Sequence, residues 1–218
     1  MKRLIIICEG QTEQEFCKVV LIPFFSNKAI HLDRPIIKKS GGGIVHWETL
    51  KRDIEIHLKK DKEAYVSTLI DYYGINAKHD FPNWKLMSTK TDKFESLNVV
   101  ESGMKEDIAT NLRHRFIPYI QLHEFEGLLL NNLAVFKNRF EDEDFINLSE
   151  LEKIISEYPN PELINDGIDT APSKRLEKHI KRYKKTKDGA AIAKAIGLEK
   201  IREKSTRFNH WISILENI

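Results

Sequence analysis

Residues 4–13 read Leu-Ile-Ile-Ile-Cys-Glu-Gly-Gln-Thr-Glu, and the abrupt change from apolar to polar residues decides the fold. The uninterrupted aliphatic run at residues 4–8 is typical of a strand buried on both faces of a parallel sheet. Gly10 ends this strand, and the polar residues after it begin a helix whose apolar side starts at Phe16. The stretch therefore predicts the first strand–turn–helix unit of an α/β sheet.

Two carboxylates follow this strand at the place where α/β proteins bind ligands. In open α/β sheets the functional crevice lies beyond the carboxyl ends of the strands, so Glu9 is expected at its mouth. Glu13 lies about one helical turn further along and can face the same space. The pair predicts a divalent cation, whereas the structural alternative for Glu13 is a charge that stabilises the amino end of the helix.

The first half of the chain alternates between strand and helix patterns. Strands separated by helices imply a parallel sheet with right-handed crossovers, and the pattern after residue 128 is helical. The sequence therefore predicts an α/β domain over residues 1–130 and a helical C-terminal portion over residues 131–218 that packs on it. The expected strands are 30–38, 65–70 and 116–122, the expected helices are 45–58 and 90–109, and Gly41, Gly42 and Gly43 form an expected turn.

Further polar residues follow two other predicted strands. Asp71 ends the third strand, while His123, Glu124 and Glu126 come directly after the fourth. Because the carboxyl ends of parallel strands meet at one edge of a sheet, these side chains are expected beside Glu9. Oxygen ligands from several strand ends suit Mg²⁺ or Mn²⁺. The predicted metal ligands are Glu9, Glu13, Asp71 and Glu126.

Each of these residues also has a structural alternative. Asp71 could start a turn, Glu124 or Glu126 could be a charge at a helix amino end, and His123 could cap a helix or pack in the core. The motifs of zinc proteases, P-loop NTPases, dinucleotide enzymes and nucleophile-elbow hydrolases do not occur in the sequence. A phosphoryl-transfer enzyme with Asp71 as acceptor would need a phosphate-donor site, for which the sequence offers no motif.

The formal net charge of +2 hides two oppositely charged blocks. Residues 141–169 contain ten acidic residues and one basic residue, whereas residues 174–204 contain twelve basic and four acidic residues. Such a basic block can neutralise a phosphate backbone, which predicts nucleic acid as a partner. The alternative is a solvated helical face that pairs with the acidic block. The predicted substrate-binding residues are His123, Lys174, Arg175, Tyr183, Lys185 and Lys187.

Local patterns within the C-terminal portion refine this prediction. Pro172 and Ser173 mark the start of a helix, with Ser173 as its N-cap and Lys174 able to grip phosphates. Tyr183 either offers an aromatic face for base stacking or packs on the core. The spacing of four later apolar residues predicts a closing amphipathic helix, with a base-stacking platform as the alternative. These residues are Phe208, Trp211, Ile212 and Leu215.

Length and composition are those of an ordinary globular chain: 218 residues, of which 41% are hydrophobic and 31% charged. The chain is long enough for one sizeable core. Its apolar runs are too short to span a bilayer and no cleavable leader precedes the first strand, so no membrane partner and a cytoplasmic location are expected. Cys8 and Cys17 are expected to be buried free thiols.

A strand that ends in Glu-Gly-x-Thr-Glu (residues 9–13), followed later by a strand that ends at Asp71, resembles the Toprim fold of topoisomerases, primases and overcoming-lysogenization-defect nucleases. The narrower resemblance rests on residues 8–13, 71–74 and 119–126. With features of the tail, they resemble more narrowly a bacterial family of Toprim-like proteins that is often associated with ABC-type or structural-maintenance-type ATPases in phage defence. The resemblance implies a Toprim-like parallel sheet, with Glu9 as the acid/base or metal-binding glutamate and Asp71 as the first acidic residue of the metal motif. The tail features are Ala171-Pro172-Ser173-Lys174-Arg175, Tyr183-Lys184-Lys185, Asp188-Gly189 and Phe208-Asn209-x-Trp211.

The sequence departs from the Toprim pattern at one position. Toprim enzymes usually carry Asp-x-Asp, whereas two tyrosines follow Asp71, and the candidates to replace the missing aspartate are Asp80 and Glu126. The expected function is a Mg²⁺- or Mn²⁺-dependent nuclease that hydrolyses phosphodiester bonds in DNA or RNA as an effector of anti-phage defence, with Glu9 and Asp71 on the ion. Lys174 would stabilise the charge that develops at phosphorus. The alternative from another class is a non-catalytic or latent partner subunit of an ABC-type ATPase encoded nearby.

Overall fold

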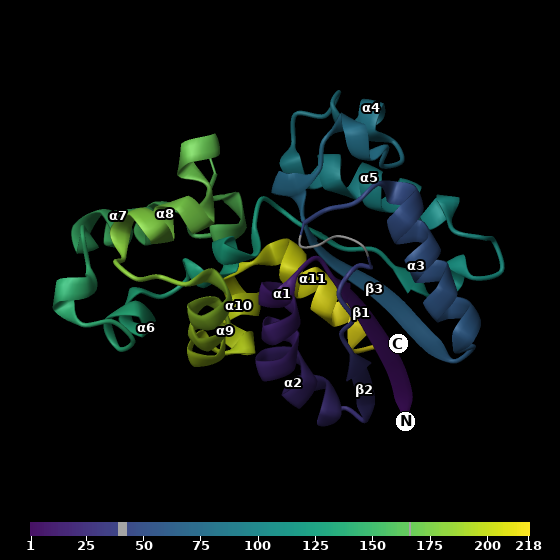
Figure 1. Cartoon of the computed structure of the whole chain (residues 1–218), viewed down its shortest axis with the longest axis horizontal. Coiled ribbons are helices and arrows are strands. Elements are labelled where there is room, and N and C mark those ends of the chain that lie inside the picture. The colour runs from purple at the N-terminus through teal and green to yellow at the C-terminus, as the bar shows by residue number, and fades with distance from the viewer. Residues whose placement is uncertain (39–42, 166) are drawn as a thin grey trace.

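A computed structural model describes residues 1–38, 43–165 and 167–218, and these residues form an α/β fold around a five-stranded parallel sheet (Figure 1). The strands lie in the order β2-β1-β3-β4, with β5 continuing beside β3 after β4. This confirms the predicted fold class, a parallel sheet flanked by helices with a helical C-terminal portion. The strands are β1 (Lys2–Cys8), β2 (Ile30–Asp33), β3 (Ala64–Asp71), β4 (Phe116–Ile117) and β5 (Ile120–Gln121).

Alternate side chains of β1 enter two hydrophobic clusters on opposite faces of the sheet. Leu4, Ile6 and Cys8 pack with helices α1, α2, α9, α10 and α11, whereas Ile5 and Ile7 pack with α3 and α5. Period-two alternation with both faces apolar is the pattern of a strand at the centre of a parallel sheet. The helices that cover the two faces are α1 (Gln11–Phe16), α2 (Ile22–Ser26), α3 (Trp47–Lys60), α5 (Lys93–Asp107), α9 (Lys185–Ile196), α10 (Leu198–Lys204) and α11 (Thr206–Leu215).

The expected fourth strand is interrupted at Pro118 and Tyr119. Proline has no N–H for the ladder, so the strand divides into β4 and β5. The hydroxyl of Thr68 replaces the missing ladder bonds, because Oγ1 accepts from Tyr119 N (3.0 Å) and donates to Tyr119 O (2.9 Å). Strand β2 (Ile30–Asp33) is also shorter than the expected second strand, residues 30–38. The expected turn at Gly41 and Gly42 lies outside the described residues.

The first helix does not run evenly. After α1 the chain widens into a π-helical turn, η1 (Cys17–Leu21), in which Ile22 N donates to Cys17 O, and α2 then begins with Pro23 in its first turn. A π turn next to a proline lets the helix continue without the hydrogen bond that the ring removes. Cys8 and Cys17 are buried free thiols, as expected, with their Sγ atoms 3.8 Å apart.

The other elements of the described chain are helices and helical turns, with isolated bridges between Phe145 and Ile180 and between Cys8 and Ile36. α6, α7 and α8 lie farthest from the sheet, at the left of the view in Figure 1. α11 buries Phe208, Trp211 and Leu215, which fits the expected closing helix. The remaining elements are η2 (Tyr72–Gly74), η3 (Ala77–His79), α4 (Trp84–Met87), η4 (Arg113–Arg115), η5 (Phe125–Leu129), α6 (Leu133–Lys137), η6 (Asp142–Asp144), α7 (Leu148–Glu157), η7 (Pro161–Leu163), η8 (Ile168–Thr170) and α8 (Pro172–His179).

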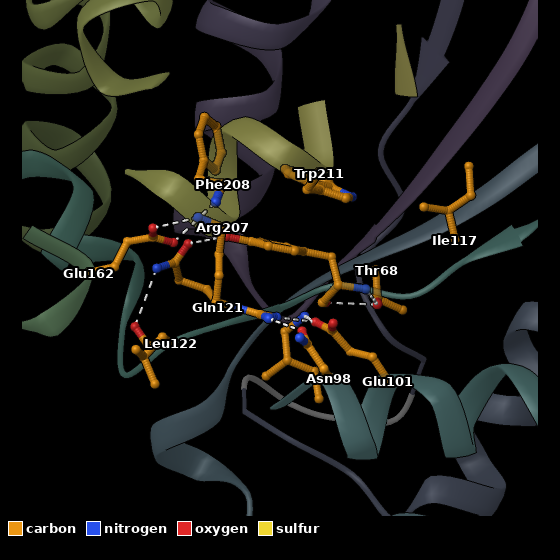
Figure 2. A network of polar contacts seen from close by, with 12 residues as sticks. Thr68, Asn98, Glu101, Ile117, Gln121, Leu122, Glu162, Arg207, Phe208 and Trp211 are labelled. Carbon is orange, nitrogen blue, oxygen red and sulfur yellow. Dashed lines mark hydrogen bonds and ion pairs between the residues drawn. The ribbon is translucent and has the colours of Figure 1, made fainter. Parts of the chain in front are cut away.

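A buried polar network fastens the closing helix to the edge of the sheet (Figure 2). Arg207 of α11 donates through Nη2 to Glu101 of α5 (2.6 Å) and through Nη1 to Asn98. Glu101 also accepts from Ile120 N (2.8 Å), so the same carboxylate holds β5. The amino end of α11 is held in turn by Glu162, whose carboxylate accepts from Arg207 N (2.8 Å). The C-terminal helix therefore shares the core and the polar contacts of the α/β portion.

No helix within the described residues is long and apolar enough to cross a membrane.

Candidate functional site

Acidic side chains from separate segments converge at the carboxyl edge of the sheet. Glu9 follows β1 and Asp71 ends β3, and these strands are parallel neighbours. The two residues are joined directly, because Asp71 N donates to Glu9 Oε2 over 2.9 Å. Glu9 is half-buried, whereas Asp71 is 7% exposed. The strand ends therefore meet as parallel topology predicts.

Glu13 closes the amino end of α1 beside this pair. Its Oε2 accepts from Gly10 N (2.9 Å), which is the capping-box arrangement of a glutamate in the first helical turn. Glu13 therefore stabilises the amino end of the helix, which is the structural alternative that the sequence offers for it. Glu13 also takes part in the acidic cluster, because burial raises its pKa and the charge of Glu124 raises it further.

Asp71 ties the sheet to the loop that carries two further glutamates. Its Oδ1 accepts from Phe125 N (2.9 Å), so Glu124 and Glu126 are held beside the strand ends. His123 turns the chain into this loop with a left-handed backbone (φ 64°), a conformation that is uncommon outside glycine. The geometry thus adds Glu124 and Glu126 to the cluster.

Glu124 accepts two hydrogen bonds from the first turn of α8. Ser173 N donates to Oε2 (2.9 Å) and Ser173 Oγ donates to Oε1 (3.0 Å). The prediction of Ser173 as N-cap is wrong, because the helix begins at Pro172 and Ala171 is the cap position. Proline suits the first helical position, and a carboxylate from another segment supplies the acceptor and the negative charge that this helix end favours.

Glu126 is fully buried and faces Lys185, the first residue of α9. Lys185 Nζ lies 3.1 Å from Glu126 Oε2, and the lysine side chain is 39% exposed. Glu126 Oε1 has no hydrogen-bond partner among the described residues. A buried carboxylate oxygen without a donor is costly, so this position is suited to a cation.

The cluster carries more negative charge than Lys185 balances. Burial raises the pKa of Glu9 and of Glu126 to about 7 each, and the neighbouring carboxylates add to the rise. Burial also raises the pKa of Asp71 well above its usual range, reinforced by Glu13 and Glu9. For Lys185, burial lowers the pKa, but Glu126 and Asp71 more than offset this, so the ammonium stays charged. The carboxylates must therefore share protons or a bound cation.

The donor set fits Mg²⁺ or Mn²⁺ in chemistry. Its members are carboxylates, with no thiolate aimed at the cluster, and hard divalent ions prefer such oxygen ligands. In the described part of the chain, no three His, Cys, Asp or Glu side chains are already arranged to hold an ion. Glu9, Glu13 and Asp71 each direct one oxygen to a backbone N–H. A bound cation would therefore bring together the carboxylate oxygens that accept no backbone hydrogen bond. Among these carboxylates, Glu126 has an oxygen that accepts no hydrogen bond from the described residues.

Of the two candidates for the missing aspartate, Glu126 lies in the cluster and Asp80 does not. Asp80 caps η3, its side chain is 81% exposed, and its partner is His46 at 3.8 Å. Glu126 instead changes the pKa of Asp71 through its charge, which requires proximity.

The other predicted substrate residues lie outside this cluster. Lys174 is exposed and pairs with Glu177 (2.8 Å), and Lys187 is exposed in the first turn of α9. Arg175 donates through Nε to Thr170 O (2.7 Å). Lys174 and Lys187 lie on outward faces because the opposite faces of α8 and α9 supply the core, whereas Arg175 is half-buried.

Tyr183 and His123 are both buried. The Tyr183 ring belongs to a hydrophobic cluster, so it does not present an open face for base stacking, and the core alternative describes its position. The His123 ring lies between Lys93 and Asn165, with 3.3 Å from Nε2 to Lys93 Nζ and 3.3 Å from Nδ1 to Asn165 Nδ2. The ring is therefore held among polar side chains, and its predicted role in substrate binding stays a prediction.

Sequence reasoning underestimated two members of the site. Glu124 is expected beside Glu9 but is not among the predicted metal ligands, and Lys185 is predicted to bind substrate and not to face the acidic residues. For Glu124, the sequence does contain a signal: it lies two residues before Glu126, directly after a predicted strand end. Nothing in the sequence separates Lys185 from Lys184 or Lys187, because its role depends on which residue begins α9.

Comparison with known proteins gives a single family. A family model matches residues 8–216, and the family is described as a domain of unknown function, DUF4276. The matched region contains every residue of the acidic cluster. Neither the curated proteins nor the solved structures yield a match. The relationship to Toprim enzymes and to overcoming-lysogenization-defect nucleases therefore stays a prediction.

Proposed function

The chain belongs to the DUF4276 family, and we propose that it is a metal-dependent nuclease that hydrolyses phosphodiester bonds in DNA or RNA. The observation that supports this most is the buried carboxylate cluster at the carboxyl edge of the sheet, formed by Glu9, Glu13, Asp71, Glu124 and Glu126. Structural carboxylates are rarely buried together without matching cations. Nucleases need such a site to bring a phosphodiester and a water molecule together.

Asp71, Glu13 and Glu126 are the residues that would hold the ion. Asp71 is fixed between the strand ladder and the loop, and Glu126 has an oxygen without a donor. When bound, Mg²⁺ or Mn²⁺ polarises a phosphoryl oxygen and orients the scissile group. Glu124 holds α8 in place through Ser173 and so positions the wall of the site.

Glu9 is the proton acceptor in this proposal. It is half-buried while the other four carboxylates are buried, so water has the best access to it. Burial raises the pKa of Glu9 to about 7, close to neutral pH, where a general base is most effective. Asp71 N holds Oε2 and fixes the orientation of the carboxylate. Glu9 would take the proton from the water that attacks phosphorus.

Lys185 is the cation that would stabilise charge at phosphorus, in place of the predicted Lys174. Lys185 faces the carboxylates and keeps part of its side chain in solvent, whereas Lys174 is paired with Glu177 on an exposed face. Lys174 and Lys187 are close in sequence to Ser173 and Lys185. Both are suited to hold the phosphate backbone outside the cluster.

The test is cleavage of supercoiled plasmid, single-stranded DNA and total tRNA by the wild type and by Glu9→Gln. Each substrate is incubated with Mg²⁺, with Mn²⁺ and with EDTA. We expect metal-dependent products from the wild type, and a loss of about 100-fold or more in rate for the variant. The products also identify the substrate class.

Glu15→Gln is the matched control, because Glu15 lies on the same helix and pairs with Lys18 at the surface. This variant should cleave like the wild type. Circular dichroism and thermal unfolding establish that both variants are folded. Cleavage by folded Glu9→Gln at the wild-type rate, or no product from the wild type in any lane, would contradict the proposal.

A further inference from the structure

A second polar pocket lies apart from the acidic cluster, between the start of β1, the end of β2 and the carboxyl end of α3. Its volume is about 670 Å³, which is within the range of small-molecule sites. None of the five carboxylates of the acidic cluster lines it. The lining residues are Arg3, Ile5, Asp33, Arg34, Pro35, His57, Lys60, Asp61 and Lys62.

Positive charge is in excess in this pocket. Four of the lining residues are arginine or lysine, and two are aspartate. Arg3 engages both aspartates, through Nη2 to Asp33 (3.0 Å) and through Nη1 to Asp61 (2.6 Å). Within the described residues, Arg34, Lys60 and Lys62 form no ion pair. The pocket therefore keeps cationic groups that its own carboxylates do not neutralise.

Two buried nitrogen atoms of the pocket lack hydrogen-bond partners. They are Nε of Arg34 and Nε2 of His57, and neither contacts an acceptor in the described part of the chain. Both atoms are enclosed by the chain, so a ligand in the pocket meets the accessible part of each side chain and not these atoms. Arg34 and His57 come from different elements, the segment after β2 and helix α3, so two nitrogen-bearing side chains from separate parts of the chain line one space.

The carboxyl end of α3 would ordinarily repel an anion, because its last carbonyl groups carry partial negative charge. Arg115 offsets this charge. Its Nη1 donates to Asp61 O (2.9 Å) and Ala64 O (2.8 Å), and its Nη2 donates to Leu58 O (2.9 Å). The carbonyl groups at this end of the helix thus already accept hydrogen bonds from a positively charged side chain.

The segment that carries Arg34 is fixed in place before any ligand arrives. Gln14 of α1 donates through Nε2 to Arg34 O (2.9 Å), and Pro35 O accepts from Cys8 N (2.8 Å). A pocket wall that is already held by hydrogen bonds loses little entropy when a ligand binds.

We propose that this pocket binds the phosphate group of a small organic phosphate ester. The guanidinium of Arg34 and the ammonium groups of Lys60 and Lys62 are the donors, and tetrahedral phosphate offers several strong acceptor oxygens. Ile5 and Pro35 form an apolar wall on which the organic part of the ester rests. Arginine is favoured in phosphate recognition because its guanidinium donors are fixed in one plane.

The experiment is isothermal titration of the full chain with adenosine 5′-monophosphate and, separately, with inorganic phosphate. A ¹⁵N–¹H spectrum of the histidine side chains reports whether His57 senses the ligand. We expect saturable binding of the ester with a Kd below about 1 mM, weaker binding of inorganic phosphate, and a shift of the His57 resonances. Arg34→Met should weaken ester binding about tenfold or more, and Arg34→Lys should recover part of it.

Lys137→Gln is the control, because Lys137 is exposed on α6 and outside the pocket. It should bind the ester like the wild type. Thermal unfolding shows whether the Arg34 variants are folded, and the Arg34→Lys variant keeps the test valid if Arg34→Met is not. No saturable binding of either probe, or equal binding by folded Arg34 variants, overturns the site. Equal affinity for inorganic phosphate and the ester overturns the assignment of an ester.

Discussion

At the scale of single residues, the acidic cluster couples folding to protons. Burial raises the pKa of Glu9 and Glu126 to about 7 in the folded chain, above the ordinary glutamate value of 4.5. The folded state therefore binds more protons than the unfolded state between about pH 4.5 and 7, and its stability falls as pH rises through that window. A cation that neutralises the carboxylates removes this loss.

We expect the midpoint of thermal unfolding, measured without metal, to fall for the wild type from pH 5 to pH 8 more steeply than for Glu126→Gln. Excess Mg²⁺ should raise the wild-type midpoint at pH 8 more than at pH 5. His57 and His179 contribute the opposite slope, because burial lowers the pKa of both, and the variant comparison cancels their effect. Parallel curves for the two proteins would contradict the role of Glu126.

Arg207 is a second residue whose replacement has a defined cost. Removing it leaves the Glu101 carboxylate buried beside Ile120 N without its guanidinium partner. We expect Arg207→Met to lower the free energy of unfolding in urea by roughly 3–5 kcal/mol, since breaking a buried ion pair strands a charge. The double variant Arg207→Met/Glu101→Gln should recover part of this loss. A double variant as unstable as the sum of both single variants would argue against direct coupling.

At the scale of secondary-structure elements, the sequence predicted the elements that local patterns determine. The aliphatic runs that became β1 and β3 place Glu9 and Asp71 at strand ends, and both positions are confirmed. The break between β4 and β5 follows from Pro118, which has no N–H for the ladder, whereas its repair by Thr68 has no local signal in the sequence. That repair depends on a residue about fifty positions earlier in the chain, so no local pattern contains it.

The repair can be tested at Thr68. Thr68→Val keeps the shape of the side chain and removes the hydroxyl that both donates to and accepts from Tyr119. We expect a loss of about 1–3 kcal/mol in the free energy of unfolding, because two backbone groups of a buried segment lose their partner. Thr68→Ser, which retains the hydroxyl, should lose less in the same urea titration. The reverse order of stability would show that the methyl group matters more than the hydrogen bonds.

At the scale of the whole molecule, the sequence predicted only part of the convergence of distant segments. Strand topology brings Glu9 and Asp71 together, whereas Glu126 and Lys185 meet through the packing of η5 against α9. That packing depends on tertiary contacts that no motif records. The oppositely charged blocks did not reveal which lysine turns inward, because a charge run on a helix has the same composition whether it faces solvent or a buried acid.

The outward lysines give the last prediction, which concerns nucleic-acid binding. Because Lys174 and Lys187 are exposed, each would displace about one condensed counterion if it contacts a phosphate. In the non-cleaving Glu9→Gln background, we expect binding of labelled single-stranded nucleic acid to weaken with salt. Removing both lysines should make the slope of log K against log salt shallower by about 1.4, since each phosphate contact on a single strand contributes about 0.7. Lys137→Gln in the same background should leave the slope unchanged, as that residue lies outside the basic block. Fluorescence anisotropy over a salt series measures all three proteins, and an identical slope for the double variant would exclude these two lysines from the interface.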